Sequence, residues 1–314
     1  ATTKKRPYSK QQNTDSEAET LLSEGFELSD SGDFERAIDR FAAALAVDEG
    51  NSDVTGQALY GLAYAHYDIR QYREAIPFFE QTIAFYSAST DPASVVSLAD
   101  SDFASLLVDL YGSLGISHRR LAHFGSALDA YYLALSGGEA LDLATRAALL
   151  VQAGIVEGEI GQYTKAEENL QQAVELLGPD GNVKMLADAI AALGWINERQ
   201  EDYERAIDYY KRSLTLFQRT DNHSAEVRTT HNIGAVYLKQ NKQAEARAAL
   251  ESGVSLLDAK DDLVERAILL NSMGELHQAT DKPDKAWRAY QKALQLSRQH
   301  SDKIGEIESL LNLG

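Results

Sequence analysis

Apolar residues recur along this chain with the spacing of amphipathic helices, and short polar segments interrupt them. In the stretch 187–217, one apolar run surrounds Leu193, and a second contains Ala206 and Tyr210. A polar segment at 200–202 separates the two runs. Because residues three or four positions apart lie on one face of a helix, the pattern predicts a helix, a short turn and a second helix.

This helical hairpin repeats at a fixed step. Glycines recur at intervals of 39 or 40 residues, and an alanine follows each of the first five about twelve residues later. The glycines are Gly115, Gly154, Gly194, Gly234, Gly274 and Gly314, and the alanines are Ala127, Ala166, Ala206, Ala246 and Ala286. Such a period indicates a solenoid of stacked hairpins. We expect Gly194 and Ala206 to face each other where the two helices cross, because larger side chains would separate the backbones.

The pattern resembles the tetratricopeptide repeat family, whose units place Leu-Gly at positions 7–8, aromatic residues at 11, 17 and 24, and alanine at 20. The resemblance covers residues 18–314, and it implies an all-α, right-handed superhelical solenoid of seven full units plus the first helix of an eighth. These units are longer than the common 34 residues. In this they are similar to the Leu-Gly-Asn repeat scaffolds and to bacterial Rap-type regulators, which bind peptides or protein segments in a concave groove.

Four segments follow from this register. Residues 1–16 are polar and predict a disordered lead-in. Residues 17–89 hold the first two units, 90–107 hold an insertion and a lengthened helix, and 108–314 hold the third to seventh units and a partial eighth. The insertion is either a protruding binding element or flexible point, or a tolerated addition. Because the eighth unit stops after its first helix, we expect the native protein to continue past Gly314.

Composition restricts the class of partner. The formal net charge of −18 argues against nucleic acid, whose phosphates the chain would repel. No apolar run reaches the length that a membrane span needs, and no signal peptide is visible. There is no cysteine, which excludes disulfides and thiol chemistry. We interpret the chain as a cytoplasmic protein without membrane insertion.

The sequence holds no catalytic motif and suggests no metal or cofactor. His66, His118 and His277 all fall at unit position 11, where the resemblance implies a buried aromatic residue. We interpret these histidines as packing substitutes rather than metal ligands. The prediction is that the chain is not an enzyme.

In the family that the chain resembles, the first helix of each unit lines the groove, with positions 2, 5, 6, 9, 12 and 13 pointing inward. The residues predicted there to bind a ligand are Phe26, Tyr60, Tyr64, Tyr67, Arg119, Arg120, Trp195, Arg199, Arg228, His231, Asn232, Lys239, Asn271 and Asn312. The tyrosines are either contact residues or packing residues. The cations either bind an acidic ligand or pair with nearby Glu and Asp. The asparagines suit the backbone of an extended ligand.

The leading hypothesis is a non-enzymatic scaffold that binds a peptide or an extended protein segment in the groove. Two alternatives stay open. The chain is either the regulatory or sensor region of a larger signalling protein, or a scaffold for self-assembly. The set of lysine and asparagine positions that clamps chaperone C-termini in this family is missing from consecutive units, which argues against chaperone recognition.

Overall fold

The computed structural model describes residues 17–48, 52–88, 100–137, 141–179, 181–220, 222–257, 263–300 and 302–314. Over these residues the chain forms fifteen α-helices and no strand, so the prediction of an all-α repeat protein is confirmed. The predicted lead-in at 1–16 and the part of the insertion at 90–99 lie outside the described residues. The helices are α1 (Glu17–Ser31), α2 (Phe34–Val47), α3 (Ser52–Asp68), α4 (Tyr72–Ala88), α5 (Asp100–Arg120), α6 (Phe124–Leu135), α7 (Leu143–Glu159), α8 (Tyr163–Leu177), α9 (Val183–Arg199), α10 (Tyr203–Gln218), α11 (His223–Lys239), α12 (Gln243–Leu256), α13 (Leu263–Ala279), α14 (Pro283–Gln299) and α15 (Lys303–Leu313).

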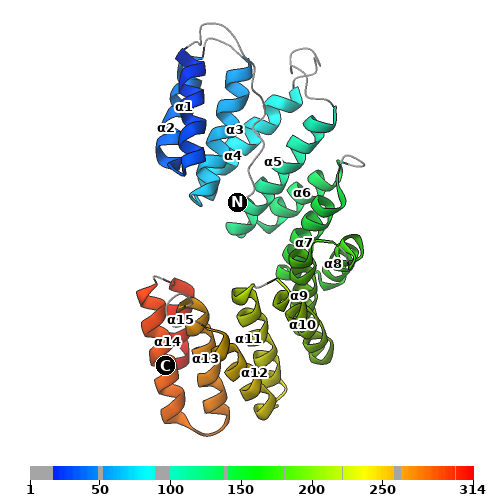
Figure 1. Ribbon diagram of the computed structural model, residues 1–314, viewed down its shortest axis with the longest axis vertical. Helices are drawn as coiled ribbons and strands as arrows, with labels where there is room; N and C mark the ends of the chain where they lie inside the picture. Colours follow the sequence, from blue (N-terminus) through cyan, green and yellow to red (C-terminus); the bar gives the residue numbers. More distant parts are fainter. Residues whose placement is uncertain are drawn as a thin grey trace. The chain divides into compact units, whose positions relative to one another are not determined.

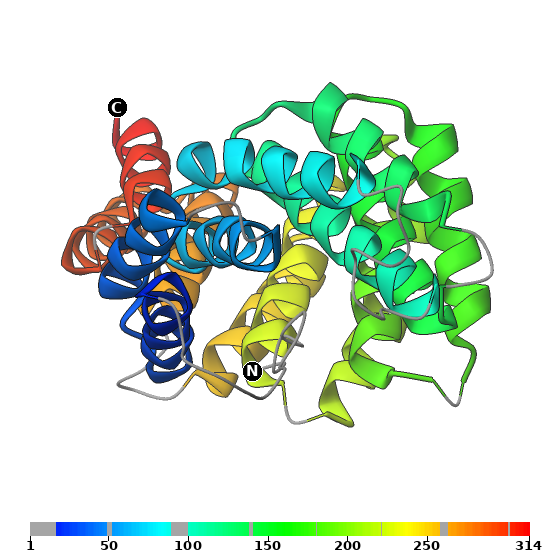
Figure 2. The ribbon, with the colours of Figure 1, turned by 90° about the horizontal axis from the view of Figure 1, so that it is seen from above.

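The chain forms two compact bodies, Ala1–Gly161 and Gln162–Gly314, which we call the N-terminal and C-terminal bodies. The N-terminal body contains α1 to α7, and the C-terminal body contains α8 to α15. Within each body, helices that are adjacent in the sequence pack side by side as antiparallel hairpins (Figures 1 and 2). Helix α5 has 21 residues, against 15 or 17 in the other first helices of complete hairpins.

The turn inside each hairpin has one conformation throughout the chain. Its second residue lies in the left-handed region, with φ between 54° and 83°, and the seven residues concerned are Gly32, Arg70, Ala122, Gly161, Glu201, Asn241 and Asp281. The next N–H then donates to a carbonyl five residues earlier, as from Asp202 N to Asn197 O at 2.9 Å. This bond closes the end of the first helix and reverses the chain within a few residues.

The repeating glycine at unit position 8 makes room for an aromatic ring. A Cβ atom on Gly194 would lie 2.7 Å from the ring of Tyr210, and one on Gly115 would meet the ring of Tyr131 in the same way. Both tyrosines come from position 24 of the second helix and are fully buried. The glycine is therefore required by the tyrosine ring, and not by Ala206 as the sequence led us to expect.

Alanine at unit position 20 lies in the core of every hairpin. Six of the seven are fully buried and the seventh, Ala286, is 3% exposed. Such positions admit no larger side chain without moving the helices apart. In the part of the chain that the structure describes, no helix combines the length and hydropathy of a membrane span.

Candidate functional site

The predicted binding residues lie on the first helices of the hairpins, and we call the side that carries unit positions 2, 5, 6, 9, 12 and 13 the first-helix face. Six of these residues lie in the N-terminal body and eight in the C-terminal body. Neighbouring first helices contact each other directly, as α1 does with α3 and α11 with α13. Each body therefore presents a row of helices on which the predicted residues fall.

In the N-terminal body the aromatic residues pack into the core. Tyr60 and Tyr64 are each only 7% exposed, and their rings lie 4.6 Å apart. The ring of Tyr64 also meets that of Phe79 edge-on at 5.1 Å, and Ser113 Oγ donates to its hydroxyl at 3.3 Å. Burial raises the pKa of Tyr64. The structure thus favours the packing interpretation for Tyr60 and Tyr64.

Two further aromatic residues of this body are only partly buried. Tyr67 lies 6.3 Å from the ring of Tyr64, and Phe26 meets Phe41 edge-on at 4.9 Å. Both leave part of the ring accessible. They are the aromatic residues of this first-helix face that a ligand could reach.

Two of the predicted cations are paired within their own body. Arg119 lies 3.5 Å from Glu159 and donates to Gln152 at 3.2 Å. In the C-terminal body, Lys239 Nζ lies 2.8 Å from Glu198 Oε1. In both cases unit position 12 faces position 13 of the next unit. Local pairing therefore accounts for Arg119 and Lys239.

Glu198 is a residue of this face that the sequence analysis treated only as an offset to the arginines. Its second oxygen, Oε2, accepts a hydrogen bond from the hydroxyl of Tyr210 at 2.7 Å. Glu198 therefore connects α9, α10 and α11. The signal was present in the sequence, because positions 12 and 13 of successive units carry opposite charges in both bodies.

The predicted polar residues on α11 and α13 form a hydrogen-bonded group. His231 Nε2 lies 2.8 Å from Ser272 Oγ, and His231 Nδ1 lies 3.3 Å from Asn232 Oδ1. Burial lowers the pKa of His231. Asn271 is 1% exposed, and its Oδ1 accepts from Ser309 Oγ at 3.1 Å. These residues join α11, α13 and α15, while Asn312 on α15 is half-buried.

Trp195 and Arg199 occupy one side of α9, one helical turn apart. Trp195 packs against the cluster that contains Ile207 and Tyr210, and part of its ring stays accessible. Arg199 is exposed, as are Arg228 on α11 and Arg120 on α5. These side chains are the predicted binding residues that remain most accessible to a ligand.

The histidines at unit position 11 pack against neighbouring helices. The ring of His66 stacks on Phe78, with 5.6 Å between centroids and 5° between planes. Burial lowers the pKa of His118. The described residues contain no group of three His, Cys, Asp or Glu that could hold a metal ion.

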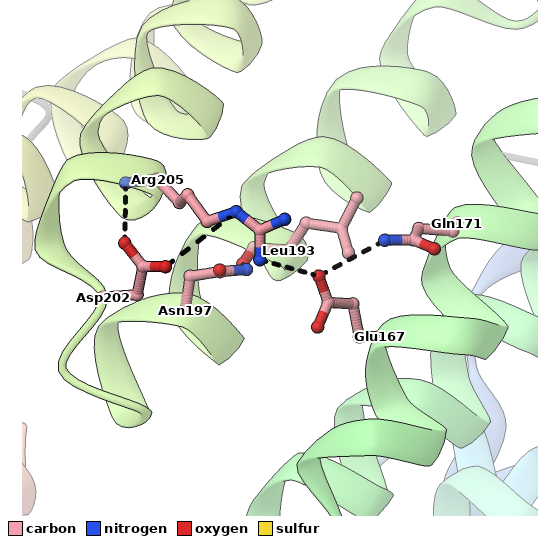
Figure 3. Close-up of polar contacts among 6 residues, drawn as sticks. All are labelled: Glu167, Gln171, Leu193, Asn197, Asp202 and Arg205. Carbon is pink, nitrogen blue, oxygen red and sulfur yellow. Dashed lines mark hydrogen bonds and ion pairs between the residues drawn. The ribbon is translucent and has the colours of Figure 1, made fainter.

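A polar junction between hairpins lies beside this face, in the C-terminal body (Figure 3). Arg205 on α10 reaches back to Glu167 on α8, with 3.6 Å between its Nη1 atom and the carboxylate. Its Nε atom lies 3.9 Å from Asp202, and its backbone N–H donates to the same carboxylate at 3.2 Å. Gln171 donates to Glu167, and the buried Asn197 donates to Leu193 O. One cation thus pairs with two carboxylates at this junction.

Comparison with known proteins establishes the class. The profile of the tetratricopeptide repeat family matches residues 16–88, 145–219 and 186–259. These segments cover more than half of the chain, which belongs to the tetratricopeptide repeat family.

Individual relatives are distant. The chain is 21% identical over 311 residues to Protein KINESIN LIGHT CHAIN-RELATED 1 of Arabidopsis thaliana, covering 86% of this chain and 51% of that protein. It therefore spans about half the length of this relative. Among solved structures, a tetratricopeptide repeat protein from Parabacteroides merdae superposes with a TM-score of 0.69 at 14% identity, over 95% of this chain and 99% of the other. Aspartyl phosphate phosphatase F from Bacillus subtilis superposes with a TM-score of 0.65 at 15% identity, over 96% and 80%. These likenesses show the fold.

Proposed function

We propose that this chain is a non-enzymatic scaffold that binds a peptide or an extended protein segment on its first-helix face. The observation that carries the proposal is the pair Trp195 and Arg199 on α9. An accessible indole ring and an exposed guanidinium lie one turn apart. Aromatic and arginine side chains of this kind supply much of the binding energy at protein interfaces.

The surroundings of this pair favour an acidic ligand. Arg199 and Arg228 are exposed, and neither makes an ion pair with a carboxylate in the described part of the chain. Lys239 is already paired with Glu198, which leaves the two arginines to provide positive charge. An acidic side chain beside an apolar one would complement Arg199 and Trp195 together.

A displayed library of random peptides tests this proposal. Peptides selected on the wild-type chain are measured by fluorescence anisotropy against the double variant Trp195→Ala with Arg199→Ala. We expect affinity to fall by roughly tenfold or more, because the loss of one hot-spot residue costs about 2 kcal/mol. Circular dichroism confirms that the helices remain.

The chain offers a matched control. Trp287 is 53% exposed on the second helix α14, and Arg288 follows it. The variant Trp287→Ala with Arg288→Ala removes the same two residue types from a second helix. Equal loss of affinity in both variants, or no loss in the first, would contradict binding on the first-helix face.

Self-assembly is a second candidate, and the surface of α15 favours it. Ile307, Leu310 and Leu311 are exposed by 58%, 45% and 76%. Three neighbouring apolar side chains form a surface that a second copy could cover. Sedimentation at rising concentration should show association in the wild type and a monomer in Leu311→Glu. A constant monomer mass in the wild type would exclude it.

A further inference from the structure

The junction in Figure 3 has a counterpart two repeats later in the chain. Its four key positions, Glu167, Asn197, Asp202 and Arg205, each recur after a step of 80 residues. The counterparts are Arg247, His277, Lys282 and Lys285. Both carboxylates of the first junction are thus replaced by cations, and the original cation is kept as lysine.

The structure brings these four residues together between α12, α13 and α14. Lys282 N donates to the carbonyl of His277 at 2.8 Å, which closes the turn. Gln243 Nε2 donates to Ala279 O at 2.9 Å and holds the start of α12 against the end of α13. Arg247 follows Gln243 by one helical turn. Burial lowers the pKa of His277, and the charges of Lys285, Arg247 and Lys282 lower it further.

This cluster lacks the counter-ions that the first junction has. Among the described residues, neither Arg247 nor the two lysines form an ion pair, although Arg247 is half-buried. The Nδ1 atom of His277 is buried and has no hydrogen-bond partner there either. Asp202 also caps α10 through the N–H of Arg205, whereas Lys282 provides no such cap for α14.

Nearby carboxylates do not fill this gap. Those closest in sequence are all exposed and make no ion pair with the cluster in the described structure: Glu245, Glu251, Asp281 and Asp284. Three neighbouring cations in a protein of net charge −18 repel one another unless an anion lies between them. An anion from outside the chain would satisfy the cations and the imidazole together.

We propose that Arg247, His277, Lys282 and Lys285 form a binding site for a doubly charged phosphoryl group. A guanidinium, two ammonium groups and an imidazole N–H converge from three segments, which suits a tetrahedral dianion with several acceptor oxygens better than a single carboxylate. The site lies at the turn end of a hairpin and does not depend on ligand binding by the first-helix face.

Inorganic phosphate and sulfate are the first probes. Isothermal titration calorimetry on the full chain should detect binding of both, and the imidazole signal of His277 in NMR spectra should shift with the same affinity. If neither anion binds, the proposal is overturned. Binding without a shift of His277 places the anion elsewhere and overturns it as well.

The first junction supplies the variant that tests the site. Arg247→Glu with Lys282→Asp introduces the carboxylates found at Glu167 and Asp202, so Lys285 gains the internal partners that Arg205 has. We expect anion affinity to fall by roughly tenfold or more while the helix content is kept. The control Lys242→Asp makes the same charge change at the preceding hairpin turn. Equal loss in this control would show general charge attraction and overturn the site.

The pH dependence gives an independent test. Sulfate stays doubly charged between about pH 8 and pH 6, while His277 gains its proton in that direction. Because a bound anion stabilises the imidazolium, sulfate should bind more tightly as the pH falls, and His277→Gln should remove most of this dependence. A pH-independent affinity in the wild type would contradict a role for His277.

A phosphoserine peptide distinguishes the two sources of a phosphoryl group. Tighter binding of a short phosphoserine peptide than of inorganic phosphate assigns the site to a phosphorylated protein segment. Equal affinities assign it to the phosphoryl group alone. If the same peptide with aspartate in place of phosphoserine binds as tightly as the phosphopeptide, the preference for a dianion is wrong.

Discussion

The two bodies of this protein use the same repeat positions in different ways. In the N-terminal body, unit positions 5 and 9 carry Tyr60 and Tyr64, which are buried among α3, α4 and α5. In the C-terminal body, those positions carry Trp195 at the edge of a cluster, and His231 and Asn271 within a polar group. A position that faces the groove by its repeat number is thus core in one body and partly accessible in the other.

This difference shows what a repeat register decides. The register sets the direction of each Cα–Cβ bond, because the helices stack at a fixed spacing. Whether the side chain reaches solvent depends on the size of its neighbours. Tyr64 is covered by Phe79 and Tyr60, whereas the residues around Trp195 leave part of its ring open.

The largest expected effect separates a buried aromatic residue from an accessible one. Tyr64→Ala should lower the free energy of unfolding by about 3–5 kcal/mol, because it leaves a cavity in the core. Trp195→Ala should cost about 1–2 kcal/mol, since part of its surface is solvated already. Urea denaturation followed by circular dichroism measures both.

Fluorescence can assign each loss to a body. Both tryptophans, Trp195 and Trp287, lie in the C-terminal body. Tyr64→Ala should therefore change the circular dichroism transition more than the tryptophan fluorescence transition. Equal destabilisation by Tyr64→Ala and Trp195→Ala would remove the distinction between the two faces.

A medium effect is expected at the hairpin turns, which the two bodies share. Ala122 and Glu201 have φ of 58° and 63°, a region that glycine adopts without strain. Ala122→Gly in one body and Glu201→Gly in the other should each stabilise the fold by about 0.5–1 kcal/mol. Gly32→Ala should have the opposite sign in thermal unfolding. Destabilisation by both glycine variants would show that the turn conformation is not strained.

The smallest effect concerns charge on the C-terminal first-helix face. Burial raises the pKa of Glu275, the neighbouring Glu308 raises it further, and Lys239 opposes them. Burial also raises the pKa of Glu308. The folded state therefore holds these protons more tightly than the unfolded state, so stability rises as pH falls toward the ordinary carboxyl pKa and is lost as pH rises through the raised values.

Glu275→Gln tests this sign. It should stabilise the C-terminal body at neutral pH by less than about 0.5 kcal/mol, because the side chain is largely solvated. The gain should disappear near about pH 4, where Glu275 itself is protonated. Tryptophan fluorescence in urea at the two pH values measures it, with Glu251→Gln as a control for net charge. A gain of the same size at both pH values would contradict the assignment to Glu275.

Much of the fold follows from the amino-acid sequence. The 40-residue period, the glycine at unit position 8 and the alanine at position 20 predicted the hairpins and the family, because small residues at fixed spacing are needed wherever helices pack closely. The same register placed His66 in a packing position, and its ring stacks on Phe78. The predicted binding residues themselves remain a proposal.

The tertiary structure decided which of those residues are accessible and which are paired. Burial depends on neighbours from other hairpins, so the sequence could not separate the covered ring of Tyr64 from the partly open ring of Trp195. Pairing depends on side chains 40 residues apart, as between Glu198 and Lys239. The sequence gives the type and periodic position of each residue because helix geometry is local, while exposure and charge balance arise only when the hairpins stack.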